Sequence, residues 1–74
     1  MTKTIYSEKY KAVLERLRQA RKEKGLTQIE VADALGKHQS FVAKCESGER
    51  RIDIVELSEF ASLYGKTMDF FLGE

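Results

Sequence analysis

Apolar side chains recur along this chain at the spacing of amphipathic helices, and no segment alternates as a strand does. The most informative segment is residues 26–46. Thr27 is a favourable N-cap and Glu30 can complete a capping box with it, so a helix is expected to begin at Gln28. Gly36 is expected to end it, because glycine adopts the left-handed C-cap conformation without a Cβ penalty. The stripe expected to face inward is Val31, Ala32 and Leu35, with Gln28 facing outward.

A second short helix must follow almost at once, beginning near Lys37 or His38, because the next apolar position, Val42, lies close to the glycine. Two helices joined by so tight a turn cross each other, as in a helix-turn-helix. Val42 and Cys45 are expected to point inward. The side chains expected to project outward are Gln39, Ser40, Phe41 and Lys44. Groups of this kind can read base edges in the major groove of DNA.

Three further helices complete the pattern. One is expected over residues 7–24 and another over residues 53–64, each ended by a glycine, and a short last helix is expected over residues 68–72. The sequence therefore predicts an all-α fold of five helices in a single domain, residues 1–74. Residues 1–5 are expected to be disordered.

Several longer motifs occur in register with this pattern: L-R-Q-A-R-K-E-K-G-L-T-Q (Leu17–Gln28), V-A-D-A-L-G, V-A-K-C-E-S-G-E-R-R, and L-S-E-F-A-S-L-Y-G-K-T-M-D-F-F-L (Leu57–Leu72). In these motifs the chain resembles the Cro and phage-repressor type of helix-turn-helix proteins, also called XRE-like regulators. The resemblance covers nearly the whole chain apart from the first few residues. It implies a compact, λ-repressor-like DNA-binding domain whose central helix-turn-helix lies at about residues 27–47.

The resemblance also implies roles for individual residues. Gln28 would hydrogen-bond a phosphate of DNA and brace the recognition helix. Arg21 and Glu46 would form a partly buried ion pair between the first helix and the end of the recognition helix. The residues that would read bases are Gln39, Ser40 and Lys44, with Phe41 between them. The remaining phosphate contacts would be Ser47, Arg50 and Arg51.

Four positions depart from the family pattern: His38, Ile52, and the apolar Ile29 and Leu63, where relatives tend to be polar. Relatives usually have serine or threonine where this chain has His38, which predicts a weaker cap for the recognition helix and leaves the imidazole to contact a phosphate. Relatives often have proline where this chain has Ile52, and the chain contains no proline. Asp53 is therefore expected to cap the fourth helix alone.

Length and composition restrict the class of protein. A chain of 74 residues has a marginal core, which self-association would help to stabilise. The single cysteine cannot form an internal disulfide, and the sequence has neither a long apolar run nor a recognisable leader. These features predict a cytoplasmic protein without membrane contact.

The formal net charge of +1 hides a gradient along the chain. Residues 1–25 carry eight Lys and Arg against three Glu, residues 26–51 carry four basic against four acidic, and residues 52–74 carry one against five. The gradient predicts a polar molecule whose acidic end faces away from DNA. The plainer interpretation is that these charges only solvate helix faces.

The C-terminal residues are dense in apolar side chains for a last turn. One interpretation is that Phe71 and Leu72 plug the core of the same chain. The other adds a two-fold interface formed by Met68 and Phe70 with Leu63, as the resemblance to dimeric repressors suggests. A homodimer would place two recognition helices one DNA turn apart, roughly 34 Å, and would bind an inverted repeat.

The sequence contains few residues that could form a catalytic site. His38 and Cys45 lie on one helix about 10 Å apart along its axis, too far for a catalytic dyad or a shared metal. We therefore expect no catalytic residue, metal, cofactor or small-molecule ligand.

The function that the sequence favours is sequence-specific binding of double-stranded DNA, as a repressor at an operator that overlaps a promoter. Activation stays open. The alternative is a protein-binding module of the same fold, such as an antitoxin whose main partner is a toxin. The chain has no long extra segment to wrap a toxin, which favours the regulator.

Overall fold

The computed structural model describes residues 7–73, so the disorder expected for residues 1–5 lies outside the described residues. Within this range the chain forms α1 (Glu8–Lys24), α2 (Gln28–Leu35), α3 (Gln39–Ser47), α4 (Ile54–Tyr64) and α5 (Met68–Leu72), with no strand. The predicted all-α fold of five helices is confirmed. None of these helices combines the length and the apolar character that crossing a membrane requires.

Side-chain caps explain where the helices begin. The N-cap side chains of four helices accept a hydrogen bond from a backbone N–H in the first turn; they are Ser7, Thr27, Asp53 and Thr67. The predicted capping box of Thr27 and Glu30 is confirmed. The expected cap of α4 by Asp53 is confirmed, and the Glu56 carboxylate accepts the Asp53 backbone N–H at 3.1 Å and completes a second capping box.

The turn between α2 and α3 depends on Gly36, whose φ of 70° is left-handed. Its N–H donates to the Asp33 carbonyl at 3.2 Å, and the Lys37 N–H donates to the Ala32 carbonyl at 2.8 Å. These two bonds satisfy the last carbonyls of α2 and turn the chain at once into α3. The two helices therefore cross as the sequence predicted.

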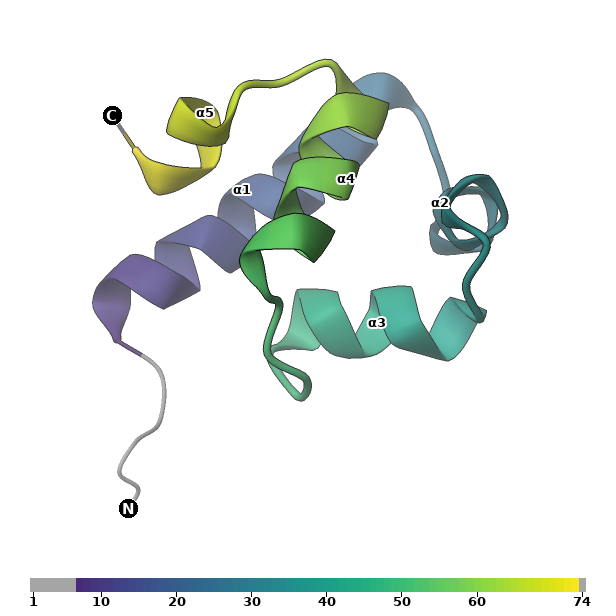
Figure 1. Ribbon diagram of the computed structural model, residues 1–74, viewed down its shortest axis with the longest axis horizontal. Helices are drawn as coiled ribbons and strands as arrows, with labels where there is room; N and C mark the ends of the chain where they lie inside the picture. The colour runs from purple at the N-terminus through teal and green to yellow at the C-terminus, as the bar shows by residue number, and fades with distance from the viewer. Residues whose placement is uncertain (1–6, 74) are drawn as a thin grey trace.

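The helices enclose one core (Figure 1). α4 passes in front of α1, α3 lies along the lower edge of the view, and α2 is seen end-on beside the start of α3. The most completely buried side chains come from all five helices: Leu17, Val31, Val42, Cys45, Phe60 and Phe71. The fold thus presents the outer side of α3 at one edge of the molecule.

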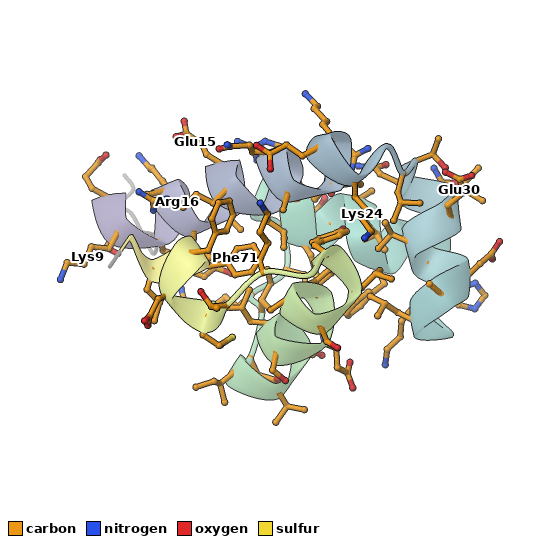
Figure 2. All side chains as sticks on the ribbon, turned by 90° about the horizontal axis from the view of Figure 1, so that it is seen from above. Lys9, Glu15, Arg16, Lys24, Glu30 and Phe71 are labelled. Atoms are coloured by element: carbon orange, nitrogen blue, oxygen red, sulfur yellow. The ribbon has the colours of Figure 1, made fainter. Side chains whose placement is uncertain are left out.

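The short α5 closes the core against α1 (Figure 2). Phe71 is fully buried, and its carbonyl accepts a hydrogen bond from Arg16 Nη1 at 3.3 Å. The expectation that Leu72 joins Phe71 in the core is wrong, because Leu72 is 54% exposed. Neighbouring residues of a helix point about 100° apart, and in α5 the inward direction is taken by Phe71 while Leu72 points toward solvent.

Candidate nucleic-acid interface

The exposed side of α3 carries Gln39, Ser40 and Lys44, as the sequence predicted. Inward-facing Val42 and Cys45 are fully buried and fix which side of the helix faces out. The acidic residue of α3, Glu46, is itself only 2% exposed. The surface of this helix therefore offers amide, hydroxyl and ammonium groups and no exposed carboxylate.

Phe41 does not share this exposed face, which corrects the expectation that its side chain projects outward. Its ring is half-buried against the core and stacks on Phe60 of α4, with centroids 6.2 Å apart and planes 4° apart. The cationic groups of Lys37 and Arg50 lie 5.3 and 4.8 Å from the ring centroid. The Phe41 ring lies close enough to α4 to bury part of its apolar area against that helix. This contact keeps the ring from extending into solvent.

The C-terminal end of α3 is held by a network centred on Glu46. Its carboxylate accepts hydrogen bonds from Arg21 Nε at 2.7 Å, Arg21 Nη2 at 3.2 Å and Gln28 Nε2 at 3.1 Å. Its backbone carbonyl accepts from Arg18 Nη1. Residues of α1, α2 and α3 thus meet at one buried carboxylate, and we call Arg21, Gln28 and Glu46 the brace.

The brace contains the ion pair that the family resemblance implied. The side chains of Arg21 and Glu46 are only 15% and 3% exposed. The hydrogen bond to Glu46 raises the pKa of Arg21, and Arg21 Nη1 also donates to the Leu26 carbonyl at 3.0 Å. Gln28 is half-buried and turned toward Glu46, so the expectation that it faces outward is wrong.

Tyr64 lies close to the brace, although the sequence indicated only that it belongs to the inward-facing stripe of the fourth helix. Its hydroxyl is buried and has no hydrogen-bond partner among the described residues. Burial, together with the charge of Glu46, raises the pKa of Tyr64 far above its usual value. The helical spacing of α4 indicates an inward Tyr64 but not what its hydroxyl meets.

The N-terminal end of α3 has no corresponding anchor. His38 occupies the N-cap with extended backbone, but its side chain makes no capping hydrogen bond. The weaker cap expected at this position is confirmed. The imidazole is exposed beside Gln39.

The segment after α3 holds the other residues expected to contact phosphate. The exposed Ser47 hydroxyl donates to the Lys44 carbonyl at 3.2 Å and accepts the Glu49 N–H at 3.3 Å. The Arg50 guanidinium donates two hydrogen bonds to the Glu56 carboxylate, at 2.8 and 2.9 Å. The guanidinium of Arg51 lies 4.7 Å from the ring centroid of Tyr10 on α1.

The side chains expected at a dimer interface are only partly exposed. Leu63, Met68 and Phe70 are half-buried and pack against the core of their own chain. The large apolar side chains that do lie open on α4 and α5 are Ile54, Val55 and Leu72, which are 75%, 62% and 54% exposed. Ile54, Leu72 and Met68 border a hollow of about 260 Å³ between α1, α4 and α5.

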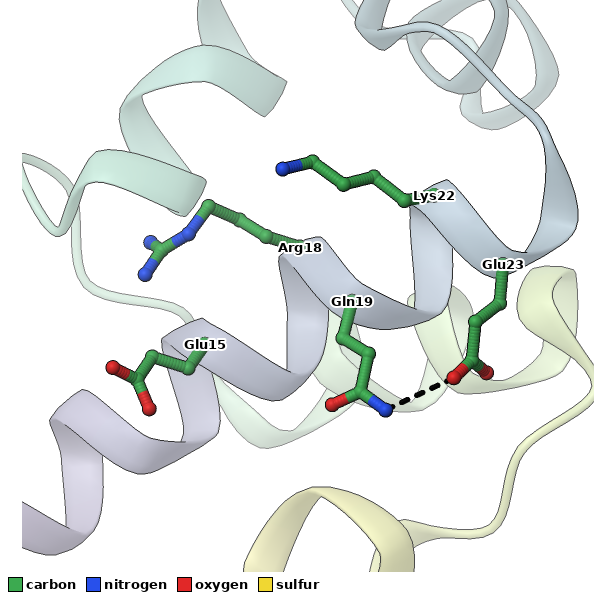
Figure 3. Close-up of a pocket in the computed structure, with 5 residues that line it drawn as sticks. All are labelled: Glu15, Arg18, Gln19, Lys22 and Glu23. Atoms are coloured by element: carbon green, nitrogen blue, oxygen red, sulfur yellow. Dashed lines mark hydrogen bonds between the residues drawn. The ribbon is translucent and has the colours of Figure 1, made fainter.

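A second, shallower hollow follows the outer side of α1 (Figure 3). Its lining mixes both signs of charge: Glu15, Arg18, Gln19, Lys22 and Glu23. Gln19 donates to Glu23 at 2.9 Å, and Lys66 pairs with the same carboxylate at 3.0 Å. Such a surface matches a solvated helix face. Across the described residues, no group of three His, Cys, Asp or Glu side chains could hold a metal ion.

Comparison with known proteins agrees with this geometry. The sequence model of a helix-turn-helix family matches residues 17–71, from the middle of α1 to α5. Among proteins of curated function, no match is found. The matched residues include α2, the Gly36 turn, α3 and the whole brace. The chain belongs to the Cro and phage-repressor type (XRE-like) helix-turn-helix family of DNA-binding regulators.

Proposed function

We propose that this protein is a repressor that binds an inverted-repeat operator as a homodimer. The observation that carries the proposal is the exposed side of α3, where Gln39, Ser40 and Lys44 stand free of exposed carboxylates while the brace holds the helix from behind. A bulky, preorganised helix with such side chains fits the major groove. Occupying an operator that overlaps a promoter would then block transcription.

The base contacts in this proposal follow from side-chain chemistry. Gln39 can pair with both hydrogen-bonding groups of adenine, Lys44 can reach a guanine acceptor, and Ser40 can donate or accept. The phosphate contacts come from residues that surround this face: Gln28, His38, Ser47 and Arg51. Gln28 has one amide hydrogen on Glu46, which leaves the other for a phosphate oxygen.

The dimer in this proposal uses a surface shifted from the one the sequence favoured. Ile54, Val55 and Leu72 leave a larger apolar area in water than Leu63 and Phe70 do, and Met68 joins them at the edge of the hollow. Covering such a patch by a second copy stabilises a small chain with a marginal core. Leu63 and Phe70 then support the interface from within each copy.

Selection of bound duplexes from a random pool tests the proposal. The expected result is an enriched palindrome whose half-site centres lie about one DNA turn apart. Light scattering during size-exclusion should report a dimer on that duplex, and a strict monomer on DNA would contradict the homodimer. Failure to enrich any sequence would overturn the DNA-reading function itself.

Gln39→Ala tests the reading face directly. The substitution should weaken binding to the selected site by about 1–3 kcal/mol and relax the preference at one base pair. Lys24→Ala, on the exposed last turn of α1, is a control for the loss of a surface side chain. Equal losses on the selected and on a scrambled duplex would remove Gln39 from the base-reading set.

A further inference from the structure

Arg50 joins the segment after the recognition helix to the first turn of α4. Its Nη1 donates to Glu56 Oε1 at 2.8 Å and to the Arg51 carbonyl at 2.9 Å, and its Nη2 donates to Glu56 Oε2 at 2.9 Å. The guanidinium therefore donates three hydrogen bonds to groups of its own chain. Paired, parallel bonds of this kind fix a guanidinium in orientation as well as in place.

Glu56 is itself fixed, which makes it a firm anchor. Its carboxylate accepts the Asp53 N–H at 3.1 Å, and the Asp53 side chain accepts the Glu56 N–H at 2.7 Å. The hydrogen bond from Arg50 lowers the pKa of Glu56, so the carboxylate is charged at neutral pH. The side chain of Glu56 is only 15% exposed, whereas that of Arg50 is 42% exposed.

The guanidinium held in this way covers Phe41 in the first turn of α3. Its Cζ lies 4.8 Å from the ring centroid, within the range of a cation–π contact, and the ring also stacks on Phe60 of α4. Phe41 thus connects the uncapped end of α3 to α4 through two contacts. Gln39 and Ser40 share this first turn.

We propose that Arg50 is a positioning residue for the reading face and not a phosphate contact. Glu56 holds Arg50 over Phe41, and the resulting Phe41, Arg50 and Glu56 contacts, which we call the latch, fix the first turn of α3 where the N-cap side chain does not. Moving Arg50 to a phosphate would break both bonds to Glu56 and uncover the ring. Arg50 is therefore assigned to Glu56 and Phe41, beside the reading face, and not to a phosphate.

This inference rests on the proposed DNA-binding function and is tested with the duplex selected from the random pool and a scrambled duplex of equal length. Four variants are compared by fluorescence anisotropy over a range of salt concentrations: Arg50→Lys, Arg50→Ala, Glu56→Gln and the double substitution Arg50→Ala with Glu56→Gln. Glutamine at position 56 can still accept the Asp53 N–H, so the capping box survives. Glu59→Gln, which removes an exposed carboxylate elsewhere on α4, is the matched control.

A positioning role predicts that Arg50→Lys and Glu56→Gln each weaken binding to the selected duplex by about tenfold, with little change on scrambled DNA. Lysine keeps the charge but cannot make the paired bonds to Glu56. The double substitution should lose no more than Arg50→Ala alone, and the slope of log affinity against log salt should not change in any variant. Thermal melts should show every variant folded at the assay temperature.

A phosphate contact predicts the opposite pattern and would overturn the inference. Arg50→Lys would keep most of the affinity, Glu56→Gln would tighten binding to both duplexes by freeing Arg50, and Arg50→Ala would reduce the salt slope by about 0.9. Failure of the wild-type protein to prefer any duplex is a separate result, because it rejects the DNA-binding function before any variant is compared.

Discussion

The two ends of the recognition helix are held by different means. At the C-terminal end, the brace buries the Glu46 carboxylate among three side-chain hydrogen bonds from α1 and α2. At the N-terminal end, His38 makes no side-chain cap, and the first turn is fixed through the half-exposed latch. Both ends use a pair of Arg and Glu, but one pair lies inside the protein and the other at its surface.

The two ends therefore contribute differently: the brace mainly stabilises the fold, and the surface pair mainly orients the first turn of α3. Breaking a buried ion pair leaves one charge without a partner in a poorly hydrated place, so the fold depends on the brace. A surface pair exchanges its partner for water at little cost, so the Arg50–Glu56 pair of the latch orients the first turn and adds little to stability. Substitutions at the two ends should therefore differ in how strongly they lower the free energy of unfolding and in which property of the protein they change.

The largest effect is expected from Glu46→Ala. It removes the carboxylate from the brace and leaves Arg21 buried, which should lower the free energy of unfolding by about 3–5 kcal/mol. Chemical denaturation followed by circular dichroism measures this. Glu49→Ala, at an exposed acidic residue just beyond α3, should change the free energy by less than about 0.5 kcal/mol. Similar losses in both variants would show that the brace contributes no more than a surface charge.

At the other end, Phe41→Ala should lower the free energy of unfolding by about 2 kcal/mol. The value is below that for a fully buried ring, because Phe41 is only half-buried. The stack on Phe60 and the contact with Arg50 are lost with it. A double substitution with Arg50→Ala should be less destabilising than the two single losses combined, and strict additivity in the same denaturation experiment would deny their contact.

A side-chain cap at position 38 should stabilise the N-terminal end of α3. His38→Ser places a hydroxyl where the first N–H groups of α3 need an acceptor, and it should raise the free energy of unfolding by about 1 kcal/mol. Hydrogen exchange should slow at the first amides of α3. Thr27→Ser, which replaces one capping hydroxyl with another on α2, should leave stability nearly unchanged. If His38→Ser does not raise the free energy of unfolding, the latch already fixes the first turn of α3 without a side-chain cap.

Tyr64→Phe asks whether the brace extends to α4. Because the hydroxyl is buried without a partner, its removal should leave the free energy of unfolding unchanged or raise it by up to about 1 kcal/mol. Tyr10→Phe is the control, since its hydroxyl accepts the Ile52 N–H at 3.0 Å, and its loss should destabilise. A clear loss of stability in Tyr64→Phe would assign its hydroxyl a bond to the brace.

The smallest effect is the pH dependence of the latch. The folded protein lowers the pKa of Glu56, so the stability gained from this group is fully present above the usual value of 4.5 and is lost as the pH falls through the lowered value. Because Arg50 is well exposed, the change should be about 0.5 kcal/mol and should shrink with added salt. Glu56→Gln should abolish it. An unchanged acid transition in that variant would contradict the pairing.

Local signals in the sequence were sufficient to predict the helices. Thr27 with Glu30, and Gly36 after Leu35, act over a few residues and leave little for distant contacts to change. The family resemblance added the Arg21–Glu46 contact, which joins α1 to α3 and which no periodicity contains. The structure then placed Gln28 on the same carboxylate.

What the sequence could not predict depends on distances between helices. Phe41 was expected to face solvent and Leu72 to face the core, but only the positions of α4 and α1 decide which side of each helix is buried. Arg50 looked like a free cation because its partner, Glu56, lies beyond the turn into α4. The correction at Phe41 concerns its orientation, since its ring lies against Phe60 and does not project with Gln39 and Ser40.

The exposed positions of Gln39, Ser40 and Lys44 also bear on how such a protein diversifies. None of the three belongs to the brace or the latch, so a duplicated copy can exchange them for other polar residues and keep its fold. If these three residues read bases as proposed, single substitutions then make new target sequences accessible without an unstable intermediate. Two copies that diverge in this way can divide a set of promoters between them while their scaffolds stay alike.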